Sequence, residues 1–400
     1  MGIPRHFHHD SKVQPVDAIR APVNPSLEQR AEDCLALVAS QSPEACVRAV
    51  DSSRYRIGAD GSMDEEHRVE LWARARGSLE LIDPDDDWIG ALLSRREVAR
   101  CPEEPVRAES DNGPTLPASL DAARADATVG ESTHWLRTET LIIDSRGRRI
   151  LARQTCHWRQ RRIGSTAVVS WLPDLDLEPG VDRAGTSEIP WSGSMVLSST
   201  ASLSLAALIA EDLTSAPGPL GRRKLGAPAL SITRDPQVGG VGAFDAEGTP
   251  RRYGPLLYHG VFTGLLTDRE LAAEHRLSRS LGCLGQSGRG LSVVADSLVV
   301  SASSGGPGAE AMIRDVGDGL WLRGQIERTT SGLRCALAQP IANGKPHGDP
   351  GPVQLERGPL DLARAVIATS GDSRPAAIPV TGGAPLIGRA PSLQIRPPRR

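Results

Sequence analysis

The residues best suited to bind a metal ion or act as nucleophiles in this sequence are nine histidines and six cysteines. Imidazole nitrogens and thiolates are the ligands that zinc prefers, so their number alone permits a zinc enzyme. A zinc helix of the HExxH type needs two histidines one turn apart, and His67 and His275 each lack a second histidine at that spacing. His6, His8 and His9 cluster in a segment that we expect to be frayed, whereas a metal site needs a rigid scaffold. The spacing therefore indicates no metal site in this chain.

A nucleophile paired with a base is the second chemistry that we consider. Cys156 and His157 are neighbours on a predicted strand, so their side chains point to opposite faces and cannot act as a pair. Ser287 in GQSGRG approaches the GxSxG pattern of hydrolases but lacks its second glycine. The chain also has no glycine-rich phosphate loop of the GxGxxG or GxxxxGK[ST] type. The residues alone therefore indicate no known catalytic arrangement.

Composition sets the class of protein that must position any such residues. The chain has 400 residues, of which 39% are hydrophobic and 24% charged, which is typical of two or three globular domains. The net charge is −3 and the two signs are interspersed, so we expect no nucleic-acid partner. The longest strongly apolar stretch, 203–210, is too short to cross a membrane. No apolar signal core begins the sequence and the cysteines are scattered, which favours a cytoplasmic protein with free thiols.

Local patterns predict where helices and hairpins lie. Residues 26–41 carry one apolar stripe after a plausible cap and predict a helix. Apolar runs at 141–143 and 150–152 flank the turn sequence 144–147 and predict a β-hairpin. Residues 200–213 predict an apolar helix, and the chain from about 226 onward has mainly strand patterns.

These elements predict an α+β protein, in which an N-terminal α/β domain is followed by a larger β-rich C-terminal domain. The predicted parts are a flexible tail (1–25), a short N-terminal α/β domain (26–110), a middle region with β-hairpins and the apolar helix (111–222), and the C-terminal domain (223–397).

A tight turn is predicted at 244–250 in the C-terminal part. We expect Asp245 and Glu247 to be solvated there, and Gly248 to supply a positive φ. The expected role of this segment is a hairpin that holds the β-rich domain together.

Residues 226–275 contain a series of motifs in a characteristic order. The matching positions include Leu230, Ile232, Asp235-Pro236, Phe244-Asp245 and Glu247-Gly248, and they continue downstream with PIANG at 340–344 and APSLQI at 390–395. Together these motifs resemble the C-terminal region of the TldD/PmbA (TldE) family, the modulators of gyrase that form metalloprotease subunits. The resemblance covers about 190–396 and implies the fold of that family for the β-rich part.

The resemblance also implies where a metal site would lie. The catalytic, TldD-like subunits carry HExxxH on the helix before this region and a cysteine near the C-terminus, which together hold zinc. The corresponding positions here are Leu208, Ile209 and Leu213, and no residue after Cys335 is a cysteine. The helix 200–213 thus resembles a degenerate form of the metal-site helix, so we expect no catalytic residue, metal or cofactor in this chain.

A family member without these ligands resembles the TldE/PmbA-type subunit. The resemblance implies a heterodimer with a TldD-like catalytic subunit, which would carry the zinc, and a peptide substrate that is unfolded or a precursor. In such a pair this chain would shape the cavity and bind the substrate backbone.

Two alternatives remain open from the sequence. The chain would be an enzyme in its own right if it used a non-metal nucleophile on the same scaffold, with His259, Cys283 and Ser287 as candidates that would also serve in substrate binding. It would otherwise be a peptide-binding scaffold without a protease partner.

Overall fold

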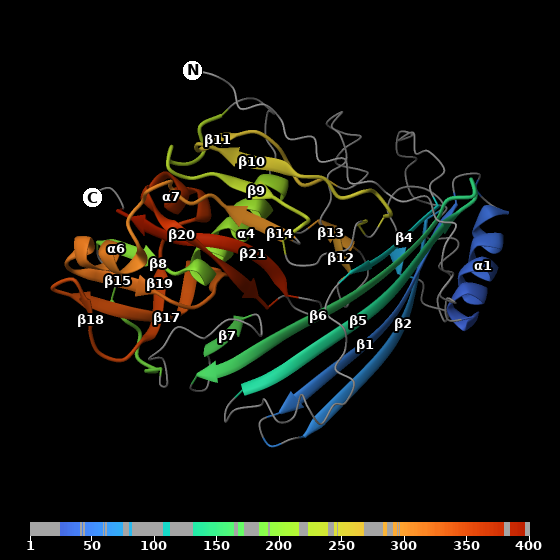
Figure 1. Cartoon of the computed structure of the whole chain (residues 1–400), viewed down its shortest axis with the longest axis horizontal. Helices are drawn as coiled ribbons and strands as arrows, with labels where there is room; N and C mark the ends of the chain where they lie inside the picture. Colours follow the sequence, from blue (N-terminus) through green and yellow to red (C-terminus); the bar gives the residue numbers. More distant parts are fainter. Residues whose placement is uncertain are drawn as a thin grey trace.

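A computed structural model of the chain contains two large β-sheets (Figure 1). The structure describes residues 25–40, 42, 45–58, 60, 62–74, 80–81, 107–112, 131–163, 167–171, 184–190, 193–215, 223–238, 244–245, 247–267, 283–285, 291–293, 295, 297–379 and 385–396. Residues 1–24 of the predicted tail, which include His6, His8 and His9, lie outside the described residues. Ser287 also lies outside them.

The N-terminal sheet has seven strands in the order β3-β2-β1-β5-β6-β4, with β7 paired to β6. Their bounds are β1 Cys46–Gly58, β2 Met63–Arg74, β3 Glu80–Leu81, β4 Arg107–Asn112, β5 Glu131–Asp144, β6 Arg149–Ile163 and β7 Ala167–Trp171. Every pairing is antiparallel except that of β4 with β6. Figure 1 shows β1, β2, β5 and β6 as long, curved strands that run below the C-terminal elements.

Helix α1, Pro25–Ala39, covers one face of this sheet at one end. Its apolar stripe of Leu27, Ala31, Cys34 and Val38 is buried against odd-numbered residues of β1 and β5. Because successive strand residues point to opposite faces, the even-numbered residues of β1 form the other face of the sheet. The helix predicted at 26–41 is therefore confirmed, and its period of 3.6 explains which residues reach the sheet.

The predicted hairpin at 141–152 is confirmed as the β5–β6 connection. The Asp144 carboxylate accepts hydrogen bonds from the backbone N–H groups of Arg146 and Arg148, both at 2.9 Å, and fixes the turn. Both strands are much longer than the apolar runs that predicted them. Since β5 pairs with β1 along its whole length, the predicted boundary at residue 110 falls within one sheet. Strands assigned from sequence to a middle region thus belong with the N-terminal strands.

The C-terminal sheet has twelve strands, with β11-β10-β9-β14-β21-β8-β15-β17-β16 as its main path. Strands β18 and β19 pair with β17, and β20 pairs with β21. The bounds are β8 Ser194–Leu197, β9 Ile232–Arg234, β10 Gly254–Tyr258, β11 Val261–Phe262, β14 Ser297–Val300, β15 Gly319–Leu322, β16 Ile326–Thr329, β17 Gly332–Ala342, β18 Lys345–Pro346, β19 Gly351–Leu355, β20 Val366–Ile378 and β21 Leu386–Ile395. A separate pair joins β12 Cys283–Gly285 to β13 Leu291–Val293.

In the part of the chain that the structure describes, three helices accompany the C-terminal sheet: α4 Ser199–Ser215, α6 Ala309–Val316 and α7 Pro359–Arg364. Helix α4 packs against β14, β20 and β21, and its apolar side chains belong to the main hydrophobic core. The apolar helix predicted at 200–213 is confirmed. Among the described helices, none is long and apolar enough to cross a membrane.

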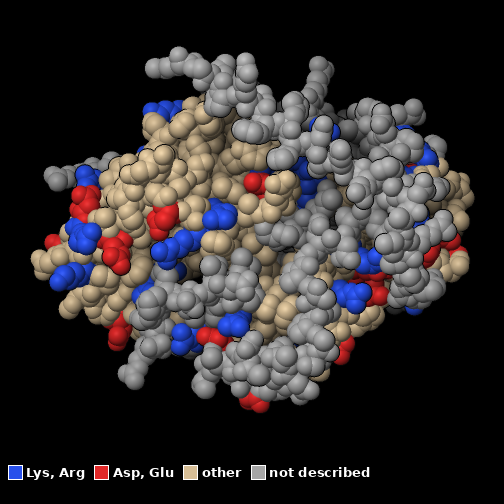
Figure 2. Space-filling view, viewed as in Figure 1, with Lys and Arg blue, Asp and Glu red and all other residues tan. Residues whose placement is uncertain are grey.

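Among the described residues, apolar clusters join the N-terminal sheet to the C-terminal part at two places. Near β7, Ile163 of the N-terminal sheet packs with Leu337 of β17 and with Ala184 and Ala336. At the α1 end, Phe244 packs against an apolar cluster on the even-numbered face of the N-terminal sheet. Figure 2 shows acidic and basic side chains interspersed on the face in view, as the sequence predicted. The α+β class, with a larger β-rich C-terminal part, is confirmed.

Candidate functional site

The positions to which the resemblance assigns metal ligands lie inside the hydrophobic core. Leu208, Ile209 and Leu213 on α4 are 8%, 1% and 6% exposed and pack among core residues of the C-terminal sheet. Hydrocarbon side chains offer no lone pair to a cation. These three side chains are close-packed and contribute to the hydrophobic core. Within the described ranges, no three His, Cys, Asp or Glu side chains are grouped so as to hold a metal ion.

Of the three candidates for another nucleophile or a substrate contact, His259 is the one whose side chain is described. It lies in the turn between β10 and β11 with φ +49°. Its backbone N–H donates to Ser231 Oγ at 2.9 Å, and its Nδ1 lies 3.1 Å from the Pro228 carbonyl oxygen. These contacts stabilise the turn. Cys283 begins β12, which pairs with β13, and Ser287 lies outside the described residues.

Three other cysteines are buried thiols with little nucleophilic character. Burial raises the pKa of Cys34, Cys156 and Cys335 to about 11 in each case. A thiol with such a pKa stays protonated near neutral pH, and the thiolate is the reactive form. These cysteines therefore act as small apolar residues, Cys34 on α1, Cys156 in β6 and Cys335 in β17.

The expectation that Asp245 and Glu247 are solvated is wrong: they are only 4% and 2% exposed. The Asp245 carboxylate accepts hydrogen bonds from the backbone N–H groups of Glu247 at 2.7 Å and Thr249 at 3.0 Å. The turn itself forms as predicted, and Gly248 has φ +76°. Sequence pattern missed the burial because the surface that covers the turn belongs to the distant N-terminal sheet.

The buried turn docks onto the N-terminal sheet. A Cβ on Gly248 would lie 3.0 Å from Ile150 Cδ1 and 3.3 Å from Ile142 Cδ1, so the backbone contacts the sheet directly. Arg148 on the same sheet is 3% exposed and forms an ion pair with Asp144 at 3.1 Å. The segment 244–250 is thus a joint between the two sheets, rather than a hairpin internal to the β-rich domain.

Burial dominates the electrostatics of this joint. It raises the pKa of Asp245 to about 6, although the two backbone hydrogen bonds and the guanidinium groups of Arg251 and Arg234 pull in the opposite direction. Arg234 is itself 1% exposed. An ionisable group with such a shift is often functional, but a joint between two sheets accounts for this one structurally.

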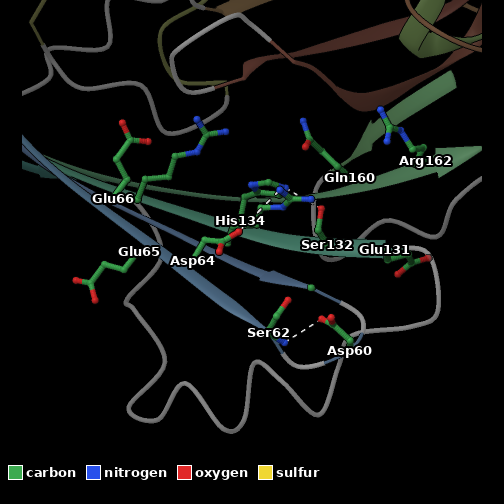
Figure 3. A pocket seen from close by; sticks show the side chains of 13 residues that line it. Asp60, Ser62, Asp64, Glu65, Glu66, Glu131, Ser132, His134, Gln160 and Arg162 are labelled. Atoms are coloured by element: carbon green, nitrogen blue, oxygen red, sulfur yellow. Dashed lines mark hydrogen bonds and ion pairs between the residues drawn. The ribbon is translucent and has the colours of Figure 1, made fainter. Parts of the chain in front are cut away.

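A polar pocket of about 890 Å³ lies at the other end of the N-terminal sheet (Figure 3). Its floor is formed by neighbouring positions on the even-numbered face: Arg54 and Arg56 of β1, Ser132 and His134 of β5, and Gln160 of β6. The remaining lining residues are Gly58, Asp60, Ser62, Asp64, Glu65, Glu66, Glu131 and Arg162.

His134 forms the centre of the pocket floor. It is 3% exposed, its Nε2 lies 2.8 Å from Ser132 Oγ, and its ring stacks on Trp158 with centroids 5.1 Å apart. The pKa of His134 is lowered to about 4, mainly by burial and further by the guanidinium groups of Arg54 and Arg56. The imidazole is therefore neutral at physiological pH.

Sequence reasoning missed this pocket. The residues that form it extend from Arg54 to Arg162 along the chain, and the pairing of β1, β2, β5 and β6 brings them together. The one available signal was the charged and polar residues at alternate positions of long strand segments, such as Arg54 and Arg56.

Solved structures with a similar fold include three proteins from different organisms. The chain resembles a putative modulator of DNA gyrase from Thermotoga maritima (16% identity, TM-score 0.61, 92% of this chain and 98% of the other). It resembles TldE from Thermococcus kodakarensis (14% identity, TM-score 0.62, 91% of this chain and 98% of the other). It also resembles a putative modulator of DNA gyrase from Bacteroides thetaiotaomicron (14% identity, TM-score 0.61, 92% of this chain and 97% of the other). At these identities the likeness shows the fold alone.

Sequence comparison identifies the family. No curated protein matches the chain. The model of the PmbA/TldA metallopeptidase C-terminal domain matches residues 190–394, which is just over half of the 400 residues. The match agrees with the resemblance drawn from the motifs at 226–275 and 340–395, and the chain belongs to the PmbA/TldD metallopeptidase family.

Proposed function

We propose that this chain is the non-catalytic, TldE-like subunit of a heterodimeric zinc metallopeptidase that cleaves unfolded or precursor peptides. The zinc and the catalytic water belong to a TldD-like partner that carries HExxxH. This chain shapes the cavity of the pair and binds the substrate backbone. It has no cofactor of its own.

The observation that carries the proposal is the packing of α4. Leu208, Ile209 and Leu213 stand where the resemblance puts the ligands and the base of a catalytic subunit, and all three are core side chains. Recreating a metal site there would place a carboxylate and two imidazoles inside an apolar core, which is strongly unfavourable without compensating partners.

A reducing compartment fits the same proposal. Cys34, Cys46, Cys156 and Cys335 are all buried free thiols. Because disulfides form in secreted proteins, free cysteines favour a cytoplasmic peptidase pair.

Co-expression with an HExxxH-bearing family member from the same genome tests the proposal. We expect the two chains to co-purify in a one-to-one complex, with zinc at one equivalent per pair. Peptidase activity on an unstructured peptide should require both chains and should disappear when the partner's HExxxH histidines are changed to alanine.

Two outcomes would refute the subunit role. One is stoichiometric zinc in this chain alone together with peptidase activity. The other is full activity of the partner without this chain, combined with the absence of a complex at micromolar concentrations. Peptidase activity of this chain without metal would favour the alternative with a different nucleophile.

A further inference from the structure

Two exposed tyrosines lie on one short strand near the edge of the C-terminal sheet. Tyr253 directly precedes β10 and Tyr258 ends it, and they are 69% and 59% exposed. Aromatic residues make up only 3% of the chain and three of them are tyrosines, so two of the three stand in solvent at this strand. Figure 1 shows β10 and β11 at the upper edge of the C-terminal sheet, away from the N-terminal strands β1 and β2.

A β-bulge brings both tyrosines to the same face of the sheet. Pro255 and Leu257 pair with consecutive residues of β9, so Leu256 is an extra residue in β10. The extra residue shifts the alternation by one position, so Leu256 and Leu257 are both buried. Tyr253, Pro255 and Tyr258 then share the opposite face, and all three are exposed. In a regular strand, two residues five positions apart would point to opposite faces.

The same face continues across β11 to a basic side chain. Tyr258 pairs with Val261, and Val261 forms an isolated bridge with Lys224. Because directly opposite residues of antiparallel strands point to one face, Tyr258 and Lys224 lie on either side of the half-buried Val261. We call the surface formed by Tyr253, Pro255, Tyr258, Val261 and Lys224 the β10–β11 face.

Basic groups outnumber acidic ones around the β10–β11 face. Arg223, Lys224 and Arg252 are exposed, and among the described residues their side chains form no hydrogen bond or ion pair. The described segments 223–238 and 251–267 contain one carboxylate, that of Asp235, which is half-buried. The surface is therefore basic, although the whole chain has a net charge of −3.

The dimensions and chemistry of this face suit the surface of another protein. Five strand residues separate the two tyrosines by roughly 15 Å, which is wider than one small ligand and within the size of an ordinary protein interface. Tyrosine and arginine are enriched at interfaces and among their binding hot spots. A basic face is complementary to an acidic one. A symmetric contact with a second copy would bring like charges together, so the partner is a different chain.

We propose that the β10–β11 face docks onto an acidic surface of the TldD-like catalytic subunit. The proposal rests on the proposed function for the identity of the partner. It assigns the contact to one edge of the C-terminal sheet, where Tyr253 and Tyr258 are buried in the interface and Lys224 pairs with a carboxylate of the partner.

Binding of the full chain to the purified HExxxH partner, followed by surface plasmon resonance, tests the proposal. Tyr253→Ser and Tyr258→Ser should each weaken binding about tenfold, mainly through faster dissociation. Lys224→Glu should also weaken binding about tenfold, mainly through slower association, and its effect should shrink in about 0.5 M salt.

Matched controls lie elsewhere on the molecule. Leu37→Ser removes an exposed apolar side chain on α1, and Lys345→Glu reverses an exposed charge on β18, far from β11 in the strand order. Both should leave the affinity unchanged. Thermal unfolding of each variant shows whether the hairpin is intact. Because the Tyr258 ring contacts His259, with centroids 4.4 Å apart, Tyr253→Ser tests the face if Tyr258→Ser disturbs the turn.

Several results would overturn the proposal. A complex whose affinity is unchanged by the two serine substitutions and by Lys224→Glu would refute the docking surface and leave the subunit role intact. Absence of any complex would refute both. A homodimer that the serine substitutions dissociate would identify a second copy as the occupant. Binding of a single-stranded oligonucleotide that these substitutions abolish, with partner binding unaffected, would identify a nucleic-acid site instead.

Discussion

Replacing Asp245 with asparagine at the joint between the sheets should stabilise the protein at neutral pH. The side chain is 4% exposed, and its Oδ1 accepts both backbone hydrogen bonds of the turn. Oδ2 has no hydrogen-bond partner among the described residues. Asparagine keeps the acceptor that the turn needs and removes the buried charge.

The magnitude follows from the shift in pKa. Burial raises the pKa of Asp245 from 3.8 to about 6, which is about two units or about 3 kcal/mol. The folded state binds this proton more tightly than the unfolded chain. The penalty is therefore small below pH 4, grows as the pH rises through the range 4 to 6, and is complete at pH 7.

Asparagine has an unfavourable term of its own, because burying its amide hydrogens without acceptors costs about 1 kcal/mol. We therefore expect Asp245→Asn to gain about 2 kcal/mol at pH 7.5 and to show no gain near pH 4. Urea unfolding followed by tryptophan fluorescence at both pH values measures the difference, since the fully buried Trp72 belongs to the apolar cluster at the joint.

Asp235→Asn is the matched control. Asp235 accepts the same kind of turn hydrogen bond, from the Gln237 backbone N–H at 3.0 Å, but is only half-buried. Because the Asp235 side chain is partly exposed to solvent, its substitution removes no buried charge and should not give the gain in stability expected at position 245. A loss of stability in Asp245→Asn at pH 7.5 would refute the reasoning, because attraction to Arg234 and Arg251 would then outweigh the cost of burial.

Three further outcomes are expected. Gly260 has φ +72°, and a Cβ there would lie 2.2 Å from the Gly226 carbonyl oxygen. Gly260→Ala should therefore lower the free energy of unfolding by about 3 kcal/mol or more in thermal unfolding. The control Gly254→Ala, with open space around its Cβ, should cost under about 1 kcal/mol. Ile209→Ala should cost about 2–4 kcal/mol in urea unfolding, because it leaves a cavity in the core. His134 should stay neutral to about pH 4 in an NMR titration; since the unfolded chain protonates near 6.5, His134→Gln should reduce the loss of stability between pH 6.5 and 4.

The elements that sequence predicted well are those specified by local pattern. Helix α1 follows from the stripe Leu27, Ala31, Cys34 and Val38, whose period needs no knowledge of the partner surface. The β5–β6 hairpin follows from turn chemistry at Asp144 and the apolar runs beside it. Helix α4 follows from its composition, because a helix apolar on most sides must be buried.

What sequence missed depends on contacts between distant segments. Asp245 and Glu247 have the composition of a solvated turn, and only the N-terminal sheet buries them. The domain boundary at 110 was placed in a linker-like stretch, yet β5 continues the sheet that β1 begins. Register along strands of 13 to 15 residues decides which side chains meet, and no local pattern specifies that register.

The even-numbered face of the N-terminal sheet is apolar at the α1 end and polar at the other end. At the α1 end, Val50, Ile142 and Ile150 form an apolar cluster that receives Phe244, so burial of hydrocarbon stabilises the joint. At the pocket end, Arg54 and the buried His134 take the same alternate positions of the same strands. A buried histidine with an unpartnered Nδ1 lowers stability, and an apolar residue in its place would raise it. Folding alone therefore does not explain the polar end, and because natural proteins break packing rules mainly where function requires it, this end is a candidate for a functional role.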